Sequence, residues 1–292
     1  MTGCSMNKPQ WLRKTLHSGR DFRNIHEMME KHNLHTVCRE AACPNRWECF
    51  AKKTATFLIS GPSCSRHCRF CNIAGNPPAP LDPGEPERVA QLASDMGLTY
   101  VVVTSVTRDD LPDGGAEMFS RTIKALRKKI SGVRVEVLIP DFKGDRNALE
   151  TIVAAFPDVI NHNVETVPRL YPAVRPGADY ERSIGIIRRV GVMNPRIVTK
   201  SGMMLGMSEQ DNEVEDVLTD LVDAGCRLFT LGQYLAPSKH HWPVSRYVSP
   251  EEFDAWQNLA LEAGFYGAAA GPFVRSSYNA GEMFFSTVFD LS

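Results

Sequence analysis

The stretch TFLISGPSCSRHCRFC runs from Thr56 to Cys71 and joins a short apolar segment to three closely spaced cysteines. Residues 56–60 have the length and apolar character of a buried strand. Cys64, Cys68 and Cys71 follow with C-x3-C-x2-C spacing. Because parallel α/β folds bind ligands beyond the carboxyl ends of their strands, we expect these thiols to lie at the mouth of a site.

Five more apolar runs follow this strand and alternate with segments of helical period. We expect strands at 56–60, 100–105, 133–139, 159–164, 196–201 and 227–231, and helices at 85–96, 115–129, 146–156, 180–190, 212–224 and from Ser249. This alternation predicts a parallel α/β sheet with right-handed crossovers. The number of units favours a partial (β/α)6, TIM-like barrel over a closed eightfold one.

The chain divides into three parts by composition. Residues 1–55 are polar and rich in His and Arg, which indicates an N-terminal extension that carries the first cysteine group. Residues 56–270 contain the alternating units of the barrel, and residues 271–292 form a C-terminal segment. Ser249-Pro250-Glu251-Glu252 combines an N-cap with a capping-box glutamate, which predicts where the last helix of the barrel begins.

The charge balance excludes several classes of protein. Lys and Arg number 33 against 34 Asp and Glu, so no bulk positive field attracts nucleic acid or an anionic membrane. With 43% hydrophobic residues the chain is not of the disordered type. No run approaches the roughly 18 apolar residues of a membrane span. The N-terminus lacks an apolar signal, and we expect a cytoplasmic monomer.

Six of the eight cysteines lie between Cys38 and Cys71, and in a reducing compartment such clustering indicates metal binding or redox catalysis. The triplet Cys64, Cys68 and Cys71 suits an iron–sulfur cube, whose irons prefer soft sulfur ligands. Three protein ligands leave one iron open to a substrate or cofactor. The alternative is a zinc knuckle with a distant fourth ligand, although zinc sites more often pair two C-x2-C units.

Cys38, Cys43 and Cys49 form an earlier triplet with C-x4-C-x5-C spacing. A second cluster explains this arrangement most economically. Two alternatives stay open: the three residues are buried structural thiols, or the second cluster only passes electrons.

The second triplet, with Phe70 before its last cysteine, resembles the signature of the radical S-adenosylmethionine (SAM) enzymes. The resemblance implies that SAM binds the open iron and is cleaved to a 5′-deoxyadenosyl radical. It also implies a partial (β/α)6 barrel, in agreement with the strand count.

Taken together, the two triplets and the sequence Arg275-Ser276-Ser277-Tyr278 resemble the lipoyl synthase family. The similarity extends from about residue 8 to residue 282 and includes the phrases LHTVC (34–38), RDDL (108–111), PDF (140–142), NHNVE (161–165), VRPGADY (174–180), TKSG (199–202) and LGQYL (231–235).

The family resemblance implies an enzyme that inserts two sulfur atoms into a protein-bound octanoyl chain, at its sixth and eighth carbons. Two 4Fe-4S clusters and SAM are the implied cofactors, with the cluster of Cys38, Cys43 and Cys49 as the sulfur donor. The implied partners are an octanoylated lipoyl carrier (an H protein or the lipoyl domain of a 2-oxoacid dehydrogenase) and an electron donor such as a ferredoxin or flavodoxin.

The resemblance also assigns roles to residues outside the triplets. Ser277 becomes the fourth ligand of the sulfur-donating cluster, with Ser276 as the alternative, and a hard alkoxide would leave a soft cluster readily. Arg275 gates or orients that ligand, unless it forms a surface ion pair. Polar residues at or after the ends of predicted strands are expected to contact SAM, namely Thr104, Ser105, Asn163, Glu165 and Arg175. Asp109 and Asp110 either join this pocket or cap a turn before the next helix.

Three rival functions remain to be distinguished. A biotin-synthase-like sulfur-inserting enzyme shares the second triplet but should lack the first triplet and the Arg-Ser-Ser-Tyr sequence. A two-cluster electron carrier would leave most of the predicted barrel unexplained. A zinc-stabilised binding module would contain zinc and little iron.

Overall fold

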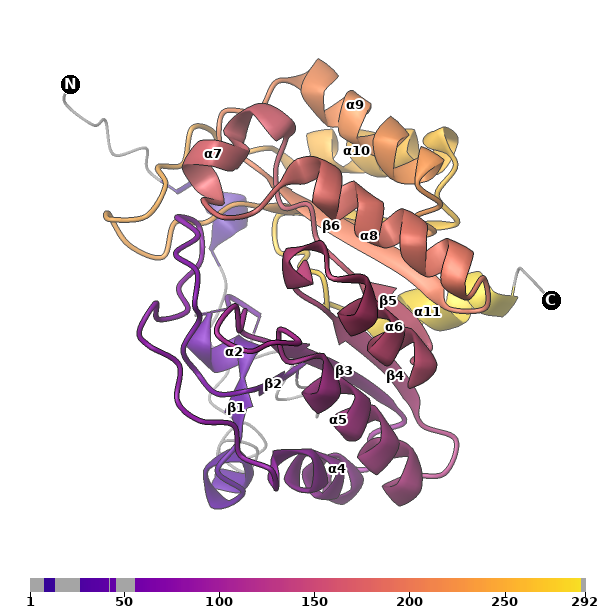
Figure 1. Ribbon diagram of the computed structural model, residues 1–292. Coiled ribbons are helices and arrows are strands. Elements are labelled where there is room, and N and C mark those ends of the chain that lie inside the picture. The colour runs from indigo at the N-terminus through magenta and orange to yellow at the C-terminus, as the bar shows by residue number, and fades with distance from the viewer. Residues whose placement is uncertain (1–7, 14–26, 42, 46–55, 290–292) are drawn as a thin grey trace.

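The computed structural model describes residues 8–13, 27–41, 43–45 and 56–289, so Cys49 lies outside the described residues. Its centre is one eight-stranded sheet whose strands follow each other in chain order (Figure 1). The strands are β1 (His35–Thr36), β2 (Thr56–Ile59), β3 (Tyr100–Ser105), β4 (Arg134–Leu138), β5 (Val159–Asn161), β6 (Val198–Leu205), β7 (Leu228–Gln233) and β8 (Gly267–Gly271). Strand β1 is antiparallel to β2, and every other neighbouring pair is parallel.

Helices cover the outer face of the sheet. The longer ones are α4 (Glu85–Asp95), α5 (Ala116–Lys129), α6 (Arg146–Ala154), α8 (Tyr180–Met193), α9 (Asp211–Asp223), α10 (Pro250–Ala263) and α11 (Ala280–Phe289); the short ones are η1 (Gln10–Leu12), α2 (Val37–Glu40), η2 (Phe142–Gly144), η3 (Pro168–Leu170) and α7 (Tyr171–Val174). The capping box predicted at Ser249 is confirmed, because its side chain accepts from Glu252 N–H at the start of α10. Among the described helices, none combines the length and the apolarity needed to cross a bilayer.

The prediction of a parallel α/β partial barrel is confirmed, with two strands more than the sequence indicated. Strand β8 has the sequence GAAAG, without any of the β-branched or aromatic residues that mark a strand. Strand β1 is only two residues long. The predicted end of β5 at Val164 is wrong, since β5 stops at Asn161 and the chain then turns through Glu165 at φ +66°.

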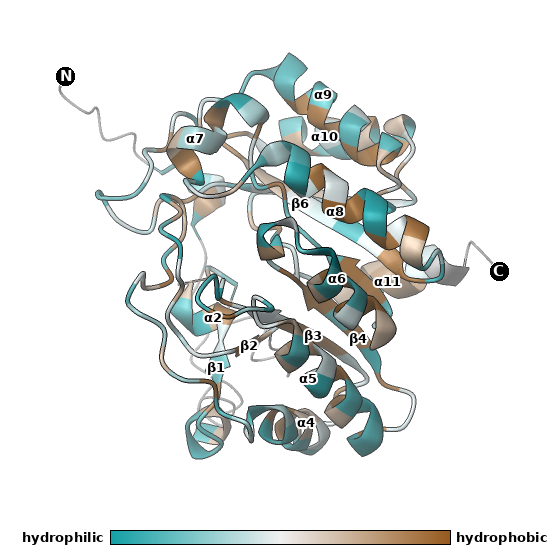
Figure 2. Cartoon of the chain, viewed as in Figure 1, coloured by the Kyte–Doolittle hydropathy of each residue, from teal (hydrophilic) through white to brown (hydrophobic). Residues whose placement is uncertain are grey.

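Successive side chains of each strand point to opposite faces of the sheet. One face packs against the helices and forms the core, and the other faces the interior of the barrel. Phe57 and Ile59 of β2 are fully buried beneath the helices, whereas Thr56 and Leu58, on the opposite face, line a cavity. Figure 2 shows the result, with apolar strands enclosed by helices whose outer faces are hydrophilic. Cys38 of the N-terminal extension belongs to the same apolar core as Phe57 and Ile59.

Helix α11 closes one end of the barrel. Phe284 packs with Val159, Val198 and Leu228, which are the first residues of β5, β6 and β7. The ring of Tyr100, the first residue of β3, lies 5.7 Å from that of Phe284. The carboxyl ends of the strands therefore form the open end.

A buried ion pair lies inside the barrel, next to the end that α11 closes. Lys200 Nζ is 3.0 Å from Glu136 Oε1, and both side chains are completely buried. Tyr100 donates its hydroxyl to Glu136 Oε2 at 2.6 Å, and Asn161 donates to Oε1 at 3.3 Å. These contacts satisfy the buried carboxylate and connect β3, β4, β5 and β6 across the interior.

Candidate functional site

A cavity of about 550 Å³ lies at the carboxyl ends of the strands, within the size range of small-molecule sites. Every site residue predicted from the sequence lines this one cavity, apart from Cys49, which is not described: Cys38, Cys43, Cys64, Cys68, Cys71, Thr104, Ser105, Asn163, Glu165, Arg175, Arg275 and Ser277. The parallel topology brings them together because all of the strands end at the same rim.

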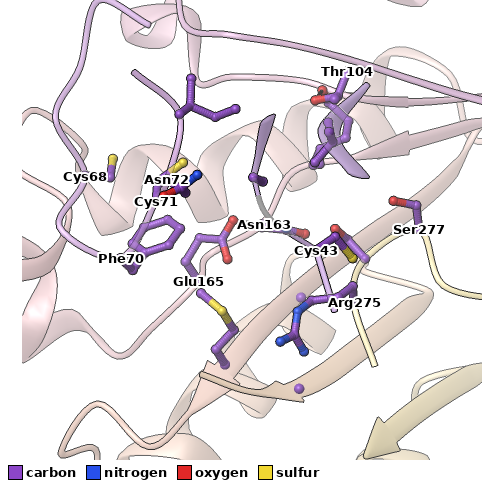
Figure 3. Close-up of a pocket in the computed structure, with 18 of the residues that line it drawn as sticks. Cys43, Cys68, Phe70, Cys71, Asn72, Thr104, Asn163, Glu165, Arg275 and Ser277 are labelled. Carbon is purple, nitrogen blue, oxygen red and sulfur yellow. Dashed lines mark hydrogen bonds between the residues drawn. The ribbon is translucent and has the colours of Figure 1, made fainter. Parts of the chain in front are cut away.

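The cavity has two ends, each with its own thiols (Figure 3). Cys68 and Cys71 lie on one side of Glu165, and Cys43 lies on the other side together with Arg275 and Ser277. One enclosed space therefore holds thiols of both triplets.

The loop that carries the second triplet, residues 60–76, begins with a strained turn. Ser60 adopts φ +68° and Gly61 φ +89°, the left-handed region that is unfavourable for serine. Buried charged side chains hold both backbone groups of Ser60. Its N–H donates to Glu85 Oε2 at 2.7 Å, and its carbonyl accepts from Arg108 Nη1 at 3.1 Å.

The middle of this cluster loop is held by Arg66, which lies between the first two cysteines. Its guanidinium donates to both carboxylate oxygens of Asp109, at 2.7 and 3.0 Å, and to Asp141 Oδ1 at 2.6 Å. Arg182 donates to the other oxygen of Asp141 at 3.1 Å. Burial would raise the pKa of Asp141, but the hydrogen bond and positive charge of Arg66 hold that pKa at about 2.

These contacts also correct the interpretation of the acidic residues after β3. Asp109 pairs with Arg66, and Asp110 pairs with Arg108 at 2.8 Å. The turn before α5 is capped instead by Asp113, which accepts from the N–H groups of Gly115 and Glu117 at 2.9 Å. Asp109 thus positions the cluster loop and is not a cap.

The end of the cluster loop is fixed by Arg69. Its N–H donates to Val174 at 2.8 Å, and its carbonyl accepts from the Trp242 N–H at 2.7 Å. Its guanidinium lies 4.9 Å from the centre of the Trp242 ring, a cation–π contact. The loop is therefore anchored to α7 and to the segment before α10 as well as to β3 and β4.

Burial raises the pKa of the Cys68 thiol, and it raises the pKa of Cys71 to about 12. Metal ligands must be thiolates, so cluster binding here displaces protons. Within the described residues, no three His, Cys, Asp or Glu side chains gather closely enough to share one ion. The cysteines of a cube bind different iron atoms and do not have to meet at one point.

The first triplet is joined to the C-terminal segment. Thr36 caps α2, which carries the buried Cys38, and the N–H of Cys43 donates to the Cys38 carbonyl at 3.2 Å. Two residues further on, Asn45 Nδ2 donates to the Phe273 carbonyl at 2.6 Å. This contact spans 228 positions and places the segment with Arg275 and Ser277 beside Cys43.

Arg275 lies inside the cavity and not in a surface ion pair. No carboxylate comes within 4.0 Å of its guanidinium in the part of the chain that the structure describes. Burial lowers the pKa of Arg275, while Cys43 and Glu165 act in the opposite direction, so Arg275 faces both groups. Gly232 permits this close packing, since a Cβ there would lie 2.2 Å from the Val274 carbonyl oxygen.

Several buried polar atoms of the cavity have no hydrogen-bond partner among the residues that the structure describes: Ser105 Oγ, His162 Nε2, Asn163 Oδ1 and Arg175 Nε. Such atoms indicate a polar ligand. Thr104 differs, because its hydroxyl already donates to the Leu138 carbonyl at 2.8 Å. Arg175 Nη1 donates to the carbonyl oxygens of Asn163 and Val164, at 3.2 and 2.9 Å. Only the other guanidinium nitrogens of Arg175 are therefore available to a ligand.

His162 was not singled out from the sequence. Its Nδ1 donates to the Ile139 carbonyl at 2.8 Å, which leaves Nε2 as an acceptor that lines the cavity. A histidine between two asparagines at the end of a predicted strand was the available signal. Its burial, which carries the argument, is visible only in three dimensions.

Comparison with known proteins places these features in a family. Residues 58–265 match the family model described as the Radical SAM superfamily. The lipoyl synthase of Caldanaerobacter subterraneus is 52% identical over 276 residues, covering 94% of this chain and 96% of its own length. The lipoyl synthase of Alkaliphilus metalliredigens is 50% identical over 275 residues, covering 94% and 95%. The chain belongs to the lipoyl synthase family.

Solved structures support the radical SAM fold of this lipoyl synthase family member. Streptococcus suis SuiB bound to its precursor peptide SuiA aligns with a TM-score of 0.59 and 12% identity, over 99% of this chain and 60% of that one. Methylornithine synthase aligns with a TM-score of 0.54 and 12% identity, over 76% and 72%. At such identities the likeness concerns the fold alone.

Proposed function

We propose that this chain inserts two sulfur atoms into an octanoyl chain carried on a lysine of a partner protein, at the sixth and eighth carbons, and so forms the lipoyl group. Two lipoyl synthases match 94% of the chain at 50% and 52% identity. The observation that carries the proposal is the single cavity that is lined by thiols of both cysteine groups.

Cys64, Cys68 and Cys71 would hold the cluster that serves SAM. This 4Fe-4S group, when bound, supplies the electron that cleaves SAM to the radical that removes hydrogen from the acyl chain. The residues present fit such a group, because three thiols lie on one anchored loop beside unsatisfied polar atoms of Ser105 and Asn163.

Cys38, Cys43, Cys49 and Ser277 would hold the second 4Fe-4S cluster, which supplies the sulfur. Cys38, Cys43 and Ser277 line the same cavity, and Asn45 fixes the C-terminal segment next to them. Ser276 also lines the cavity, so the choice between the two serines is left to experiment.

The remaining residues bind and orient the two organic ligands. Ser105 Oγ, Asn163 Oδ1 and Arg175 Nε would hydrogen-bond the polar groups of SAM, since these buried atoms have no partner among the described residues. Apolar side chains of the cavity would hold the acyl chain and exclude water: Val106, Leu138, Ile139, Met203, Met204 and Leu235. Burial raises the pKa of the Glu165 carboxyl, while the charges of Arg175 and Arg275 and the hydrogen bond from Asn163 act in the opposite direction.

The test is an anaerobic assay with reconstituted protein, SAM, a strong reductant and an octanoyl-lysyl peptide. Mass spectrometry should find a doubly thiolated product together with 5′-deoxyadenosine. Deoxyadenosine without sulfur in the peptide would contradict the proposal and indicate another radical reaction.

Matched variants separate the two clusters. Cys38→Ala should keep deoxyadenosine formation and lose sulfur insertion, whereas Cys64→Ala should lose both. Cys226→Ala is the control, because Cys226 is buried just before β7 and does not line the cavity. Ser277→Ala and Ser276→Ala, compared by iron content and product, decide which serine is the ligand.

We expect a reducing, cytoplasmic setting, because six clustered thiols must stay available for metal. A ferredoxin or flavodoxin is the proposed reductant.

A further inference from the structure

Four segments of the chain that border the cavity contain no acidic residue. Residues 8–13, 61–81, 166–178 and 234–248 include none of the 34 Asp and Glu residues. Each segment contributes to the cavity wall, for example through Lys8, Cys64, Arg175 and Leu235. We call these four segments the basic rim.

Three of the four segments contact each other directly. The Arg69 N–H donates to Val174 at 2.8 Å, and the Trp242 N–H donates to the Arg69 carbonyl at 2.7 Å. The fourth segment lines the same cavity through Lys8. The cluster loop and the segment before α10 extend on the same side of the barrel in Figure 1. Three of the segments therefore form one continuous surface, and the fourth borders the same cavity.

This surface carries positive charge that the described residues of the protein do not neutralise. Lys8, Arg13, Arg69 and Lys239 are exposed, and no carboxylate of the described residues lies within 4.0 Å of any of them. His67 and His240 are exposed beside them. Other rim cations do have partners outside the rim, as Arg169 has in Glu213.

Aromatic side chains accompany the charges. Trp11 is 42% exposed, and Trp242 is half-buried under the guanidinium of Arg69. Tryptophan and arginine are enriched at protein–protein interfaces. Complementary charge around an interface adds long-range attraction. In a chain of net charge −1, a local surface of this kind has the composition of a docking site.

We propose that the basic rim docks an acidic surface of the octanoylated carrier domain and thereby selects the protein substrate. The inference rests on the proposed function. A lysine-bound acyl chain reaches the two thiol groups only when the backbone of its carrier lies at the cavity mouth, where the rim is. Complementary charge then speeds encounter and fixes orientation, without taking part in the chemistry.

The experiment compares a protein substrate with a peptide substrate. Lys239→Glu, Arg13→Glu and the double variant are assayed as full-length, cluster-loaded protein with an octanoylated lipoyl domain and with an octanoyl-lysyl tripeptide. We expect each reversal to lower kcat/KM for the domain about tenfold at low ionic strength, mainly through KM, and less at high salt. The tripeptide should react at an unchanged rate.

A direct binding measurement supplements the kinetics. The octanoylated domain, titrated into wild-type and variant protein, should bind more weakly to each variant by a similar factor. Lys124→Glu, on the exposed face of α5 and away from the rim, is the matched charge-reversal control and should change neither quantity.

The outcomes separate this inference from the proposed function. A wild-type protein that thiolates neither the domain nor the tripeptide contradicts the proposed function. Thiolation of the tripeptide, with unaltered domain kinetics and binding in both single variants, overturns the docking surface alone. Binding of an oligonucleotide in place of the domain, weakened by the same substitutions, would also overturn it.

Discussion

Glu85 holds the turn that begins the cluster loop: its Oε2 accepts a hydrogen bond from the backbone N–H of Ser60 at 2.7 Å. Glu85 belongs to α4 and is only 5% exposed. The turn it holds places Ser60 in the left-handed region, four residues before Cys64. A buried side chain of the neighbouring helix thus stabilises a backbone conformation that serine disfavours.

Glu85→Ala should lower the free energy of unfolding by about 1–3 kcal/mol, because it leaves a buried N–H without an acceptor. Glu85→Gln should cost less, since its amide oxygen can still accept. Urea unfolding of the apoprotein measures both changes. Glu87→Ala, on the exposed side of the same helix, is the control, and an equal loss there would contradict the assignment.

The pH dependence of Glu85 gives a second readout. Burial raises the pKa of this carboxyl above its ordinary value, so the folded state retains its proton at a higher pH than the unfolded state does. Wild-type stability should therefore decline as pH rises through the raised pKa, and Glu85→Gln should lack that decline.

Asp141→Asn should lower the free energy of unfolding at neutral pH by about 2 kcal/mol, because it removes the negative charge that pairs with Arg66. The pKa of Asp141 is about 2 in the folded protein, below its unfolded value, so its stabilisation is present above pH 4 and is lost as pH falls toward 2. Denaturant unfolding across this range should show wild type and variant converging. A constant difference down to pH 2 would refute the ionic explanation.

We expect His162 to lower the free energy of unfolding as the pH falls from 7 to 5. Burial, aided by the charge of Arg175, lowers the pKa of His162 to about 4, so the unfolded chain binds the proton first. This histidine alone should reduce the free energy of unfolding by about 2 kcal/mol over that interval.

His162→Asn tests this prediction, because asparagine can still donate to the Ile139 carbonyl. In this variant, the free energy of unfolding should fall less between pH 7 and pH 5 than in wild type, as judged from urea midpoints at the two pH values. His240→Asn changes an exposed histidine and should show the same fall as wild type. Identical pH profiles for wild type and His162→Asn would show that this imidazole does not titrate differently on folding.

Removing one partner of the buried ion pair between Lys200 and Glu136 should strongly lower the free energy of unfolding. Lys200→Met leaves an unpaired buried carboxylate and is expected to cost about 3–5 kcal/mol. Lys200→Met combined with Glu136→Gln should recover part of that loss. A double-mutant cycle by chemical denaturation measures the coupling, and additive losses would show that the two groups are independent.

Local signals in the sequence were sufficient for most of the elements. The apolar run 100–105 predicts strand β3 where it lies, and the sequence from Ser249 to Glu252 predicts the start of α10. Both signals act within a few residues of the backbone. Strand β8 was missed because GAAAG pairs with β7 by backbone hydrogen bonds and has no side-chain pattern to reveal it.

The sequence by itself determined the family and the fold class of this protein, because the cysteine triplets and the alternation of strand and helix patterns are local features of the chain. Only the tertiary structure decided how the site is held. Arg66 meets Asp141 across 75 positions, and Asn45 meets Phe273 across 228. Such contacts form only when strand ends from distant parts of the chain gather at one rim, and no periodicity within a single segment encodes which partners will meet there.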